Sequence, residues 1–497
     1  MAVSWKLEGA PLPRGRAMGR DVSTLSDLIQ LEDLALLPAA PDGANATVGF
    51  ISLGCPKNLV DTENMLGLLS GRGYQITNLA GQADVLVVNT CSFIEAAKEE
   101  SIDAILEAAQ QKLNGRCRAL IVTGCMTQRY GDEILAEIPE VDAVVGTADY
   151  PRIAEIIGGV LGGGRVDAVG DPNALTDWDF PFERILSTPG HSAYLKIAEG
   201  CDCNCAFCII PVLRGRHRSR SIESIVGEAE RLAAGGTQEL LIISQDSTAY
   251  GIDRYGKPML AELLPRLARV DGIRWLRLHY AYPTRVTPAL IDVLAQEEKV
   301  LHYLDMPLQH ASPKVLREMN RPANPDRYLR LIETLRRRIP DVCLRSQFIA
   351  GFPGESEADF QQLLRFVQQT ELDHVGCFVY SQEEGTKAGE RADQVPFEVR
   401  EERAKAVMAA QAQVVARKNA ALRGRVLPVL VEAGQDHQWT GRCYRQSPGI
   451  DGVVNFTVPG GVAPQKGAFV PVRLTGADGY DLFGEYAGQA TANHPLL

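Results

Sequence analysis

The first part of the chain alternates apolar runs with stretches of helical pattern. The apolar runs cover residues 49–54, 84–90 and 119–124, and the helical stretches between them cover 61–70 and 93–113. Apolar strands that alternate with helices predict a parallel sheet covered by helices on both faces. We therefore expect an N-terminal α/β domain.

A second alternating region follows a glycine-, aspartate- and proline-rich stretch, which we interpret as a linker. Its six apolar runs are 193–198, 239–245, 275–280, 301–308, 342–349 and 374–380. Helical patterns such as 224–234 and 288–295 separate several of these runs. Six βα units predict a partial, TIM-like (βα)6 barrel with its site at the carboxyl ends of the strands.

The last part of the chain changes pattern again. Residues 398–422 favour a helix, and five short strand candidates follow at 426–432, 441–445, 453–457, 469–474 and 480–484. Five strands separated by glycine and proline predict a small all-β, OB-like barrel. The expected organisation is an extension (1–45), an α/β domain (46–156), a linker (157–186), the partial barrel (187–422) and the small barrel (423–488). Within the extension, residues 21–37 could form a short amphipathic helix.

Composition narrows the class of protein. The 497 residues carry a formal net charge of −11, which argues mildly against broad, nonspecific nucleic-acid binding. We find neither a secretory signal nor an apolar run approaching eighteen residues, so we expect a cytoplasmic protein without a membrane span. Eleven cysteines, an odd number, favour metal-bound thiolates in a reducing compartment over a disulfide scaffold.

Three of the cysteines are closely spaced directly after the first apolar run of the second region. Cys201, Cys205 and Cys208 form a C-x3-C-x2-C triplet. A 4Fe–4S cluster has four irons, so three thiolates leave one iron open to a substrate or cofactor. The alternative is a zinc knuckle, for which His217 could supply the fourth ligand.

A second group of cysteines is predicted by topology rather than by spacing. Cys55, Cys91 and Cys125 each follow one of the first three apolar runs. Loops at the carboxyl ends of parallel strands share one edge of the sheet, where ligands bind. We expect these cysteines to form a second three-cysteine site, although three unconnected buried thiols remain an alternative.

The other candidates are weaker. Cys203 lies inside the first triplet and is an alternative ligand, whereas buried thiols are the default for Cys117, Cys343, Cys377 and Cys443. The segment from Gly351 to Glu355 follows the fifth barrel strand and could border a cofactor pocket or form a turn. Residues 244–246 have a similar status, and His310 could be structural or functional.

The cysteine motifs resemble those of a known family. Cys201, Cys205 and Cys208, with Phe207 before the last of them, resemble the signature of radical S-adenosylmethionine enzymes. In that superfamily the open iron binds S-adenosylmethionine, whose reductive cleavage yields a radical that abstracts hydrogen. Segments 52–58, 89–93 and 122–126 look like a methylthiotransferase domain, and the C-terminal barrel looks like a TRAM module.

Within that family, segments 54–61, 209–215, 243–250 and 307–312 look like the branch that modifies a ribosomal protein. This resemblance implies β-methylthiolation of an aspartate in ribosomal small-subunit protein twelve. It also implies two molecules of S-adenosylmethionine per turnover, a reductant such as flavodoxin or ferredoxin, and a sulfur donor.

The resemblance also implies roles for the site residues. Cys201, Cys205 and Cys208 would hold the 4Fe–4S cluster that cleaves S-adenosylmethionine, and Cys55, Cys91 and Cys125 would hold an auxiliary 4Fe–4S cluster that presents sulfur. Phe207, Gly351 and Glu355 are candidates for the S-adenosylmethionine pocket.

Two other functions remain open. The same chemistry could act on adenosine in transfer RNA, or the chain could be a noncatalytic zinc or iron–sulfur binding protein. Between residues 424 and 484 the chain has five basic and five acidic residues. A module that grips transfer RNA should carry a basic excess, so this balance favours a protein substrate.

Overall fold

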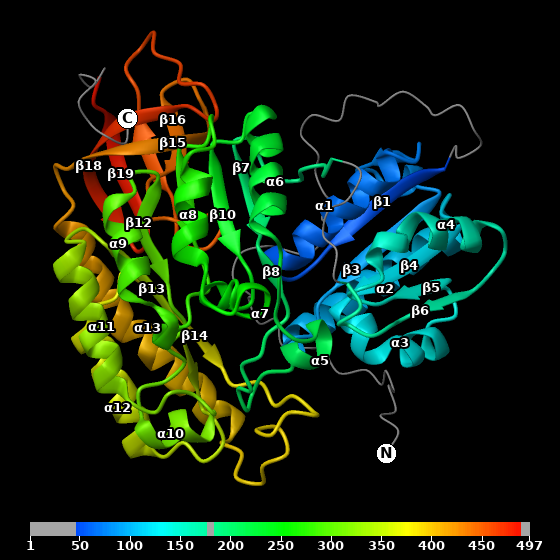
Figure 1. Ribbon diagram of the computed structural model, residues 1–497, viewed down its shortest axis with the longest axis horizontal. Coiled ribbons are helices and arrows are strands. Elements are labelled where there is room, and N and C mark those ends of the chain that lie inside the picture. Colours follow the sequence, from blue (N-terminus) through cyan, green and yellow to red (C-terminus); the bar gives the residue numbers. More distant parts are fainter. Residues whose placement is uncertain (1–45, 176–182, 489–497) are drawn as a thin grey trace.

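The computed structural model describes residues 46–175 and 183–488, which form two parallel sheets and a small barrel (Figure 1). The predicted helix at 21–37 and part of the predicted linker lie outside the described residues. The expected fold class is confirmed: a parallel α/β domain, a partial parallel barrel and a C-terminal β barrel.

The N-terminal domain contains a six-stranded parallel sheet with the order β2-β1-β3-β4-β5-β6. Its strands are β1 Thr47–Ser52, β2 Gln75–Thr77, β3 Val85–Thr90, β4 Ala119–Gly124, β5 Ala143–Val145 and β6 Val166–Ala168. Its helices are α1 Pro56–Ser70, η2 Ala80–Gln82, α2 Glu95–Asn114, α3 Cys125–Glu137, η3 Tyr150–Arg152 and α4 Ile153–Leu161. Every residue of β3 and β4 is buried, as expected for central strands between two helical layers.

The predicted linker boundary was wrong. The end of α4 and the whole of β6 lie within residues 157–186, and β6 completes the first sheet. Glycines at 158, 159 and 162–164 gave this stretch a linker-like composition. Helix α4 forms nevertheless because Ile153, Ile156 and Ile157 bury one face against the sheet. Strands as short as β2, β5 and β6 give no readable alternation.

The second sheet is open and parallel, with the order β14-β13-β12-β11-β10-β7. Its strands are β7 Ser192–Lys196, β10 Glu239–Ile243, β11 Trp275–Leu278, β12 Val300–Asp305, β13 Cys343–Ala350 and β14 His374–Val379. A two-stranded ribbon of β8 Ala198–Glu199 and β9 Arg218–Ser219 follows β7. All six predicted strands are present, and the sheet does not close, as the prediction of a partial barrel requires.

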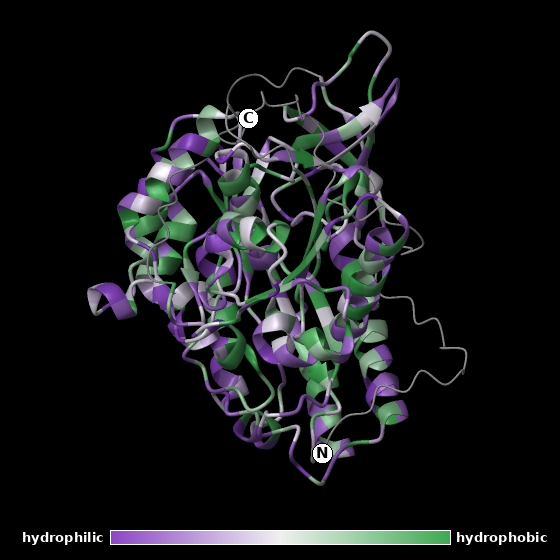
Figure 2. Ribbon diagram, turned by 90° about the vertical axis from the view of Figure 1, so that its right-hand side faces the viewer, coloured by the Kyte–Doolittle hydropathy of each residue, from purple (hydrophilic) through white to green (hydrophobic). Residues whose placement is uncertain are grey.

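Most helices of this region cover the outer side of the sheet, whereas the one at Ile210–Arg214 lies against α3 of the N-terminal domain (Figure 1). The helices of this region are α5 Ile210–Arg214, α6 Ile222–Ala234, η4 Ser247–Ala249, α7 Ile252–Tyr255, α8 Leu260–Ala268, η5 Pro283–Arg285, α9 Pro288–Gln296, α10 Pro313–Glu318, α11 Pro325–Arg338, α12 Glu357–Thr370 and α13 Phe397–Ala420. In Figure 2 the central strands are mainly hydrophobic and the outer helices carry hydrophilic residues on their outward sides. The largest apolar cluster therefore lies between the sheet and these helices.

The C-terminal strands close into a five-stranded barrel with the order β15-β16-β17-β19-β18. They are β15 Val426–Gln435, β16 Gln438–Arg442, β17 Val454–Thr457, β18 Phe469–Asp478 and β19 Asp481–Tyr486. The barrel covers the amino ends of the second sheet's strands: Trp275, the first residue of β11, packs edge-on against Phe469 with ring centroids 4.6 Å apart. The carboxyl ends of these strands, where we expect the site, lie at the opposite end of the sheet.

Candidate active site

The predicted group of Cys55, Cys91 and Cys125 lies at one edge of the N-terminal sheet. Strands β1, β3 and β4 are neighbours, and Thr90 pairs with Gly124 at the ends of β3 and β4. Cys91 and Cys125 are the next residues along the two strands, so they occupy the same level of the sheet. The Ser92 hydroxyl donates to the Cys125 carbonyl at 3.0 Å. Cys55 caps the amino end of α1 in the turn after β1.

Asparagine side chains hold these strand ends together. The Asn58 amide donates to the carbonyls of Leu53 (3.1 Å) and Thr90 (2.8 Å), which joins the β1 turn to the end of β3. The Asn89 amide in turn donates to the Asn58 carbonyl at 2.8 Å. These bonds satisfy buried backbone carbonyls and fix the loops that carry the cysteines.

Burial controls the electrostatics of this group. Burial raises the pKa of the Cys91 thiol, and the neighbouring Cys125 and Cys55 raise it further. Burial also raises the pKa of Cys125, although the adjacent Arg214 guanidinium opposes the increase. A Cβ on Gly54, the residue before Cys55, would lie 3.0 Å from the Cys91 sulfur, so the ends of β1 and β3 approach each other closely.

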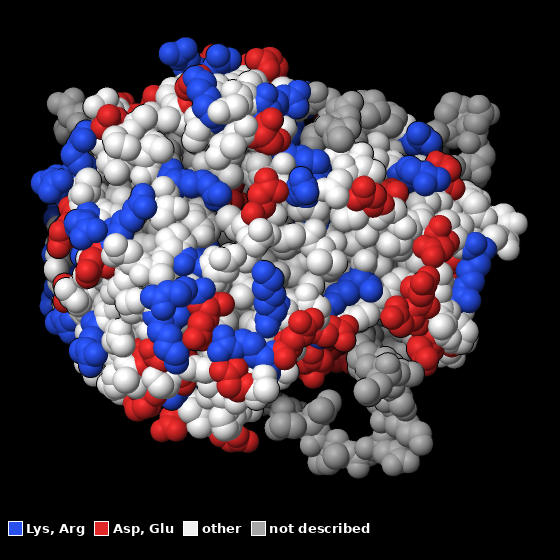
Figure 3. Space-filling view, turned by 60° about the horizontal axis from the view of Figure 1, so that its bottom comes forward, with Lys and Arg blue, Asp and Glu red and all other residues white. Residues whose placement is uncertain are grey.

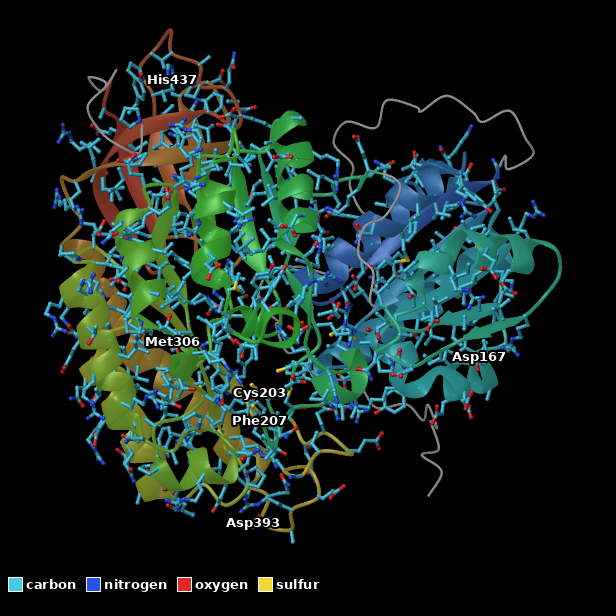
Figure 4. The ribbon with its side chains drawn as sticks, viewed as in Figure 1. Asp167, Cys203, Phe207, Met306, Asp393 and His437 are labelled. Atoms are coloured by element: carbon cyan, nitrogen blue, oxygen red, sulfur yellow. The ribbon has the colours of Figure 1, made fainter. Side chains whose placement is uncertain are left out.

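The triplet of Cys201, Cys205 and Cys208 lies in the loop after β8, at the carboxyl end of the second sheet. The Cys201 amide donates to the Gly215 carbonyl at 3.0 Å, and the Cys208 amide donates to the Cys205 carbonyl at 3.1 Å. The Arg321 guanidinium lies 3.9 Å from the Cys205 sulfur. Burial raises the pKa of Cys208 to about 12, and the nearby Cys205 contributes to that rise. In Figure 4 the labelled Cys203 and Phe207 of this loop lie on the side that faces the N-terminal domain.

Cys203, the alternative ligand, points to polar neighbours. Its sulfur lies 3.3 Å from Arg285 Nη1 and 3.9 Å from Asp246 Oδ2, and the Cys203 amide donates to the Cys201 sulfur at 3.4 Å. Asp246, one of the candidates at the end of β10, also caps η4 by accepting from Thr248 and Ala249. Asp246 therefore has a structural task as well as a place beside the cysteine loop.

The three candidates for the S-adenosylmethionine pocket lie near that loop but differ in accessibility. Phe207 is partly buried and packs in a small cluster with Phe352 and Tyr380. Gly351 follows β13 with a φ of +78°, and a Cβ there would lie 2.3 Å from Arg400 Cγ. Phe207 and Gly351 thus lie where the loop that carries Cys201, Cys205 and Cys208 meets the turn after β13.

Glu355 is committed to internal partners. Its Oε1 accepts from Arg403 at 2.9 Å, and its Oε2 accepts from the Gly351 amide at 2.9 Å and lies 3.2 Å from His310 Nε2. Its side chain is fully buried. The same contacts give His310 a structural partner, and the His310 Nδ1 accepts from the Ser312 amide at 2.9 Å.

A buried ion network joins the two cysteine groups. Arg214, in the helix after Cys208, donates to Asp61 (2.7 Å) and to Glu199 (2.9 Å), and its Nε lies 3.4 Å from the Cys125 sulfur. Lys196 pairs with the same two carboxylates. Burial alone would raise the pKa of Glu199, but Arg214 and Lys196 outweigh it and lower the pKa to about 2. Arg214 therefore connects the loop of the Cys201/Cys205/Cys208 triplet to Cys125.

The donor sets fit iron–sulfur clusters better than a single zinc ion. Each site offers three cysteines, and a cluster needs them spread around several irons rather than around one atom. His217, the proposed fourth zinc ligand, lies instead 3.2 Å from the Ser219 hydroxyl.

Sequence reasoning did not single out Asn58, Arg214 or Lys57. All three lie within segments compared with the family, 54–61 and 209–215, so their positions next to the cysteines were the available signal. Lys57 is 6% exposed, and its ammonium lies 3.3 Å from the centroid of the Tyr280 ring at the end of β11. Their convergence depends on how the two domains pack, which the sequence does not display.

Comparisons with known proteins agree with this three-part organisation. Family models match residues 47–146 (Uncharacterized protein family UPF0004), 195–367 (Radical SAM superfamily) and 424–486 (TRAM domain). A curated relative from Symbiobacterium thermophilum, "Ribosomal protein uS12 methylthiotransferase RimO", is 62% identical over 454 residues, covering 91% of this chain and 93% of the relative. The chain belongs to the RimO family.

Other RimO relatives are similar over nearly their whole length. The relative from Heliobacterium modesticaldum is 51% identical, with 88% of this chain and 94% of the relative covered. The relative from Geobacter sulfurreducens is 48% identical, with 89% and 99% covered. The predicted family and the enzyme class, a radical S-adenosylmethionine methylthiotransferase, are confirmed.

A solved structure supports the fold of this RimO family member. The radical S-adenosylmethionine methyltransferase TsrM from Kitasatospora setae aligns with a TM-score of 0.54 at 14% identity, covering 69% of this chain and 77% of that chain. Separately, none of the helices in the described part of the chain is both long enough and apolar enough to cross a membrane.

Proposed function

We propose that this chain replaces a hydrogen on the β-carbon of an aspartate in ribosomal protein uS12 by a methylthio group. The observation that carries the proposal is the pairing of two three-cysteine sites, one at the carboxyl edge of each parallel sheet, linked by Arg214 between Cys125 and Glu199. The 62% identity to a curated uS12 methylthiotransferase supports the choice of substrate.

The reaction requires two functions that ordinary side chains do not supply. A bound radical-forming cluster with S-adenosylmethionine would break the unactivated C–H bond, and the auxiliary cluster would provide the sulfur. We assign Cys201, Cys205 and Cys208 to the first cluster and Cys55, Cys91 and Cys125 to the second. A reductant such as flavodoxin or ferredoxin and a sulfur donor would complete the turnover.

The protein's own residues would fix the geometry between the two sites. Asn58 and Asn89 hold the strand ends that carry Cys55, Cys91 and Cys125, and the Cys201–Gly215 backbone bond holds the loop of the Cys201/Cys205/Cys208 triplet. Phe207 and Gly351 border that loop and would shape the S-adenosylmethionine pocket. Burial of Cys91 and Cys125 keeps water away from the place where the carbon radical must meet sulfur.

Surface charge also favours a protein substrate over transfer RNA. On the face of the molecule nearest the carboxyl ends of the strands, basic and acidic side chains are interspersed (Figure 3). A nucleic-acid surface would be predominantly basic, because phosphate contacts dominate such binding.

The test separates the two cysteine groups. The triple variant Cys55→Ala, Cys91→Ala, Cys125→Ala should lose methylthiolation of uS12 but still cleave S-adenosylmethionine reductively, because its radical-forming site is untouched. Mass spectrometry of uS12 and chromatography of the cleavage products measure the two outcomes. Loss of cleavage in a folded variant that retains the other cluster would contradict the assignment.

A second experiment tests whether the substrate is uS12 or transfer RNA. Anaerobically reconstituted wild-type protein is incubated with purified uS12 and, separately, with transfer RNA from the same cells. We expect the mass increase on uS12 alone. An increase confined to transfer RNA would overturn the proposed substrate while leaving the chemistry in place.

A further inference from the structure

A buried lysine lies where the N-terminal domain meets the mouth of the second sheet. Lys57 follows Cys55 and Pro56 in the first turn of α1, and it is 6% exposed. Its ammonium lies 3.3 Å from the centroid of the Tyr280 ring, which belongs to the other domain. Lys57 therefore lies close to Cys55, a predicted ligand of the auxiliary cluster. It also contacts the carboxyl end of the second sheet, where we expect the radical chemistry.

The backbone holds Tyr280 in position for this contact. Tyr280 has a φ of +58°, in the left-handed region that non-glycine residues seldom adopt. Its amide donates to Asp305 Oδ2 at 3.2 Å, and its carbonyl accepts from the Ser247 amide at 3.0 Å. Strained backbone fixed by two neighbouring strand ends is typical of functional sites.

Within the described residues, the Lys57 ammonium has no carboxylate within 4.0 Å, although burying an ammonium without one is unfavourable. Burial lowers the pKa of Lys57, and the neighbouring Cys55 and the more distant Glu199 and Asp305 oppose this shift. The two carboxylates are engaged elsewhere: Glu199 with Lys196 and Arg214, and Asp305 with Arg345 at 3.0 Å. The face of the Tyr280 ring attracts a cation but does not satisfy its hydrogen bonds.

Other basic groups near the two cysteine sites already have partners. Arg214 bonds Asp61 and Glu199, and Arg285 pairs with Asp246. Arg321 donates to the Pro307 carbonyl at 2.6 Å. Lys57 is thus the cation best placed to receive an anion that arrives with the substrate.

From this geometry we infer that Lys57 binds the side-chain carboxylate of the target aspartate and determines the specificity for aspartate. The inference rests on the proposed function. In aspartate the carboxylate is attached directly to the β-carbon that reacts, so a cation that holds the carboxylate also sets the position of the C–H bond. A charge-assisted hydrogen bond supplies both the affinity and the orientation.

The test compares two forms of the substrate. Binding of purified uS12, and of uS12 in which the target aspartate is replaced by asparagine, is measured on cluster-loaded protein by calorimetry. We expect wild-type protein to prefer the aspartate form by about tenfold or more, the range of a hydrogen bond to a charged group. Lys57→Met should abolish this preference by weakening only the aspartate form, and Lys57→Arg should retain part of it.

Controls separate a specific effect from a general one. Lys405→Met removes a lysine whose side chain is 75% exposed on α13 and should leave the preference unchanged. Iron content and the paramagnetic resonance of both clusters should be the same in Lys57→Met as in wild type. Loss of the N-terminal cluster in both Lys57→Met and Lys57→Gln would make Lys57 a partner of Cys55 instead and overturn the inference.

The outcomes also distinguish this inference from the proposed function. If wild-type protein methylthiolates uS12 and a loaded Lys57→Met variant still prefers aspartate over asparagine, the function stands and the role of Lys57 is wrong. If wild-type protein modifies no form of uS12, the proposed function fails, and the inference fails with it.

Discussion

Arg214 connects the loop that follows Cys208 to Cys125 of the N-terminal domain. Its Nε lies 3.4 Å from the Cys125 sulfur, while its other nitrogens bind Asp61 and Glu199. Arg214 is 1% exposed, so little water screens its charge. If Cys125 holds the auxiliary cluster, as we propose, the buried guanidinium beside its sulfur would stabilise added negative charge on that cluster.

This position predicts an effect on the reduction potential of the auxiliary cluster. Hydrogen bonds to cluster sulfurs and local charge are among the factors that set such potentials. Arg214→Gln removes a positive charge beside Cys125, so the potential of the N-terminal cluster should fall. Potentiometry followed by paramagnetic resonance can measure it in a background where Cys201, Cys205 and Cys208 are alanine.

The matched control is Arg152→Gln. Arg152 is in the N-terminal domain, which carries Cys125, but its side chain is 54% exposed and pairs with Glu155 on the surface. Arg152→Gln should leave the reduction potential of the N-terminal cluster unchanged. Equal potentials in Arg214→Gln and wild type, at equal iron content, would show that Arg214 only stabilises the domain contact.

At the scale of secondary-structure elements, the turns after the strands decide whether the cysteines converge. Gly54 precedes Cys55 with a φ of +86°, and Gly124 precedes Cys125 with a φ of +101°. A Cβ on Gly54 would lie 2.6 Å from the Cβ of Cys91, and one on Gly124 would lie 2.6 Å from the Thr90 carbonyl oxygen. Neither position has room for a side chain, and both backbones favour glycine.

Gly54→Ala should therefore remove the N-terminal cluster while the second site survives. The added methyl group would push Cys91 away from Cys55, so the variant should bind about half of the wild-type iron, as expected for one cluster out of two. Iron and sulfide analysis after anaerobic reconstitution measures this loss.

Gly81→Ala serves as the comparison in the same domain. A Cβ on Gly81 would have no neighbour within 4 Å, and this glycine does not have a positive φ. Its iron content should match wild type. A full complement of iron in Gly54→Ala would mean that the strand ends adjust more easily than the close approach to Cys91 suggests.

The sequence allowed most elements to be predicted because their patterns are strong. The buried runs of β3 and β4 and the alternation of the second region identify two parallel sheets, and parallel topology then gathers Cys55, Cys91 and Cys125. The same reasoning failed for β6, a three-residue strand after a run of glycines. Strand pairing stabilises so short a segment, and that pairing leaves no periodic signal.

The site was predictable only where chain topology or close spacing determines it. Contacts across the domain boundary, such as Arg214 with Cys125 and Lys57 with Tyr280, depend on packing between segments far apart in sequence. Glu355 illustrates the opposite case. Its place after β13 was predictable, but its engagement with Arg403 and His310 was not.

At the scale of the whole molecule, the small barrel covers the amino end of the second sheet, whereas the N-terminal domain lies beside the sheet, with α1 packed against the edge strand β7 (Figure 1). Glu239, the first residue of β10, is fully buried and pairs with Arg277 at 2.9 Å and with Arg442 of the barrel at 2.6 Å. The barrel thus closes the amino end of the sheet and leaves the carboxyl end to the cysteine sites.

The Glu239 pairs predict a large loss of stability when the carboxylate is removed. Glu239→Gln leaves two buried arginines without this partner, and breaking such a pair costs roughly 3–5 kcal/mol. The free energy of unfolding in urea should fall accordingly. Glu262→Gln, which breaks a pair with Lys257 whose side chains are 49% and 61% exposed, should change it by about 1 kcal/mol or less.

The same carboxylate predicts a specific pH dependence. Burial raises the pKa of Glu239, but Arg442 and Arg277 outweigh it and lower the pKa from 4.5 to about 2. The unfolded chain therefore binds a proton at higher pH than the folded chain, so the stabilisation is complete above pH 4.5 and is lost as the pH falls toward 2. The difference in unfolding free energy between wild type and Glu239→Gln, both freed of iron, should be constant near neutral pH and shrink below 4.5. Glutamine does not titrate, so a difference that stays constant through this range would mean that the arginines do not hold Glu239 ionised.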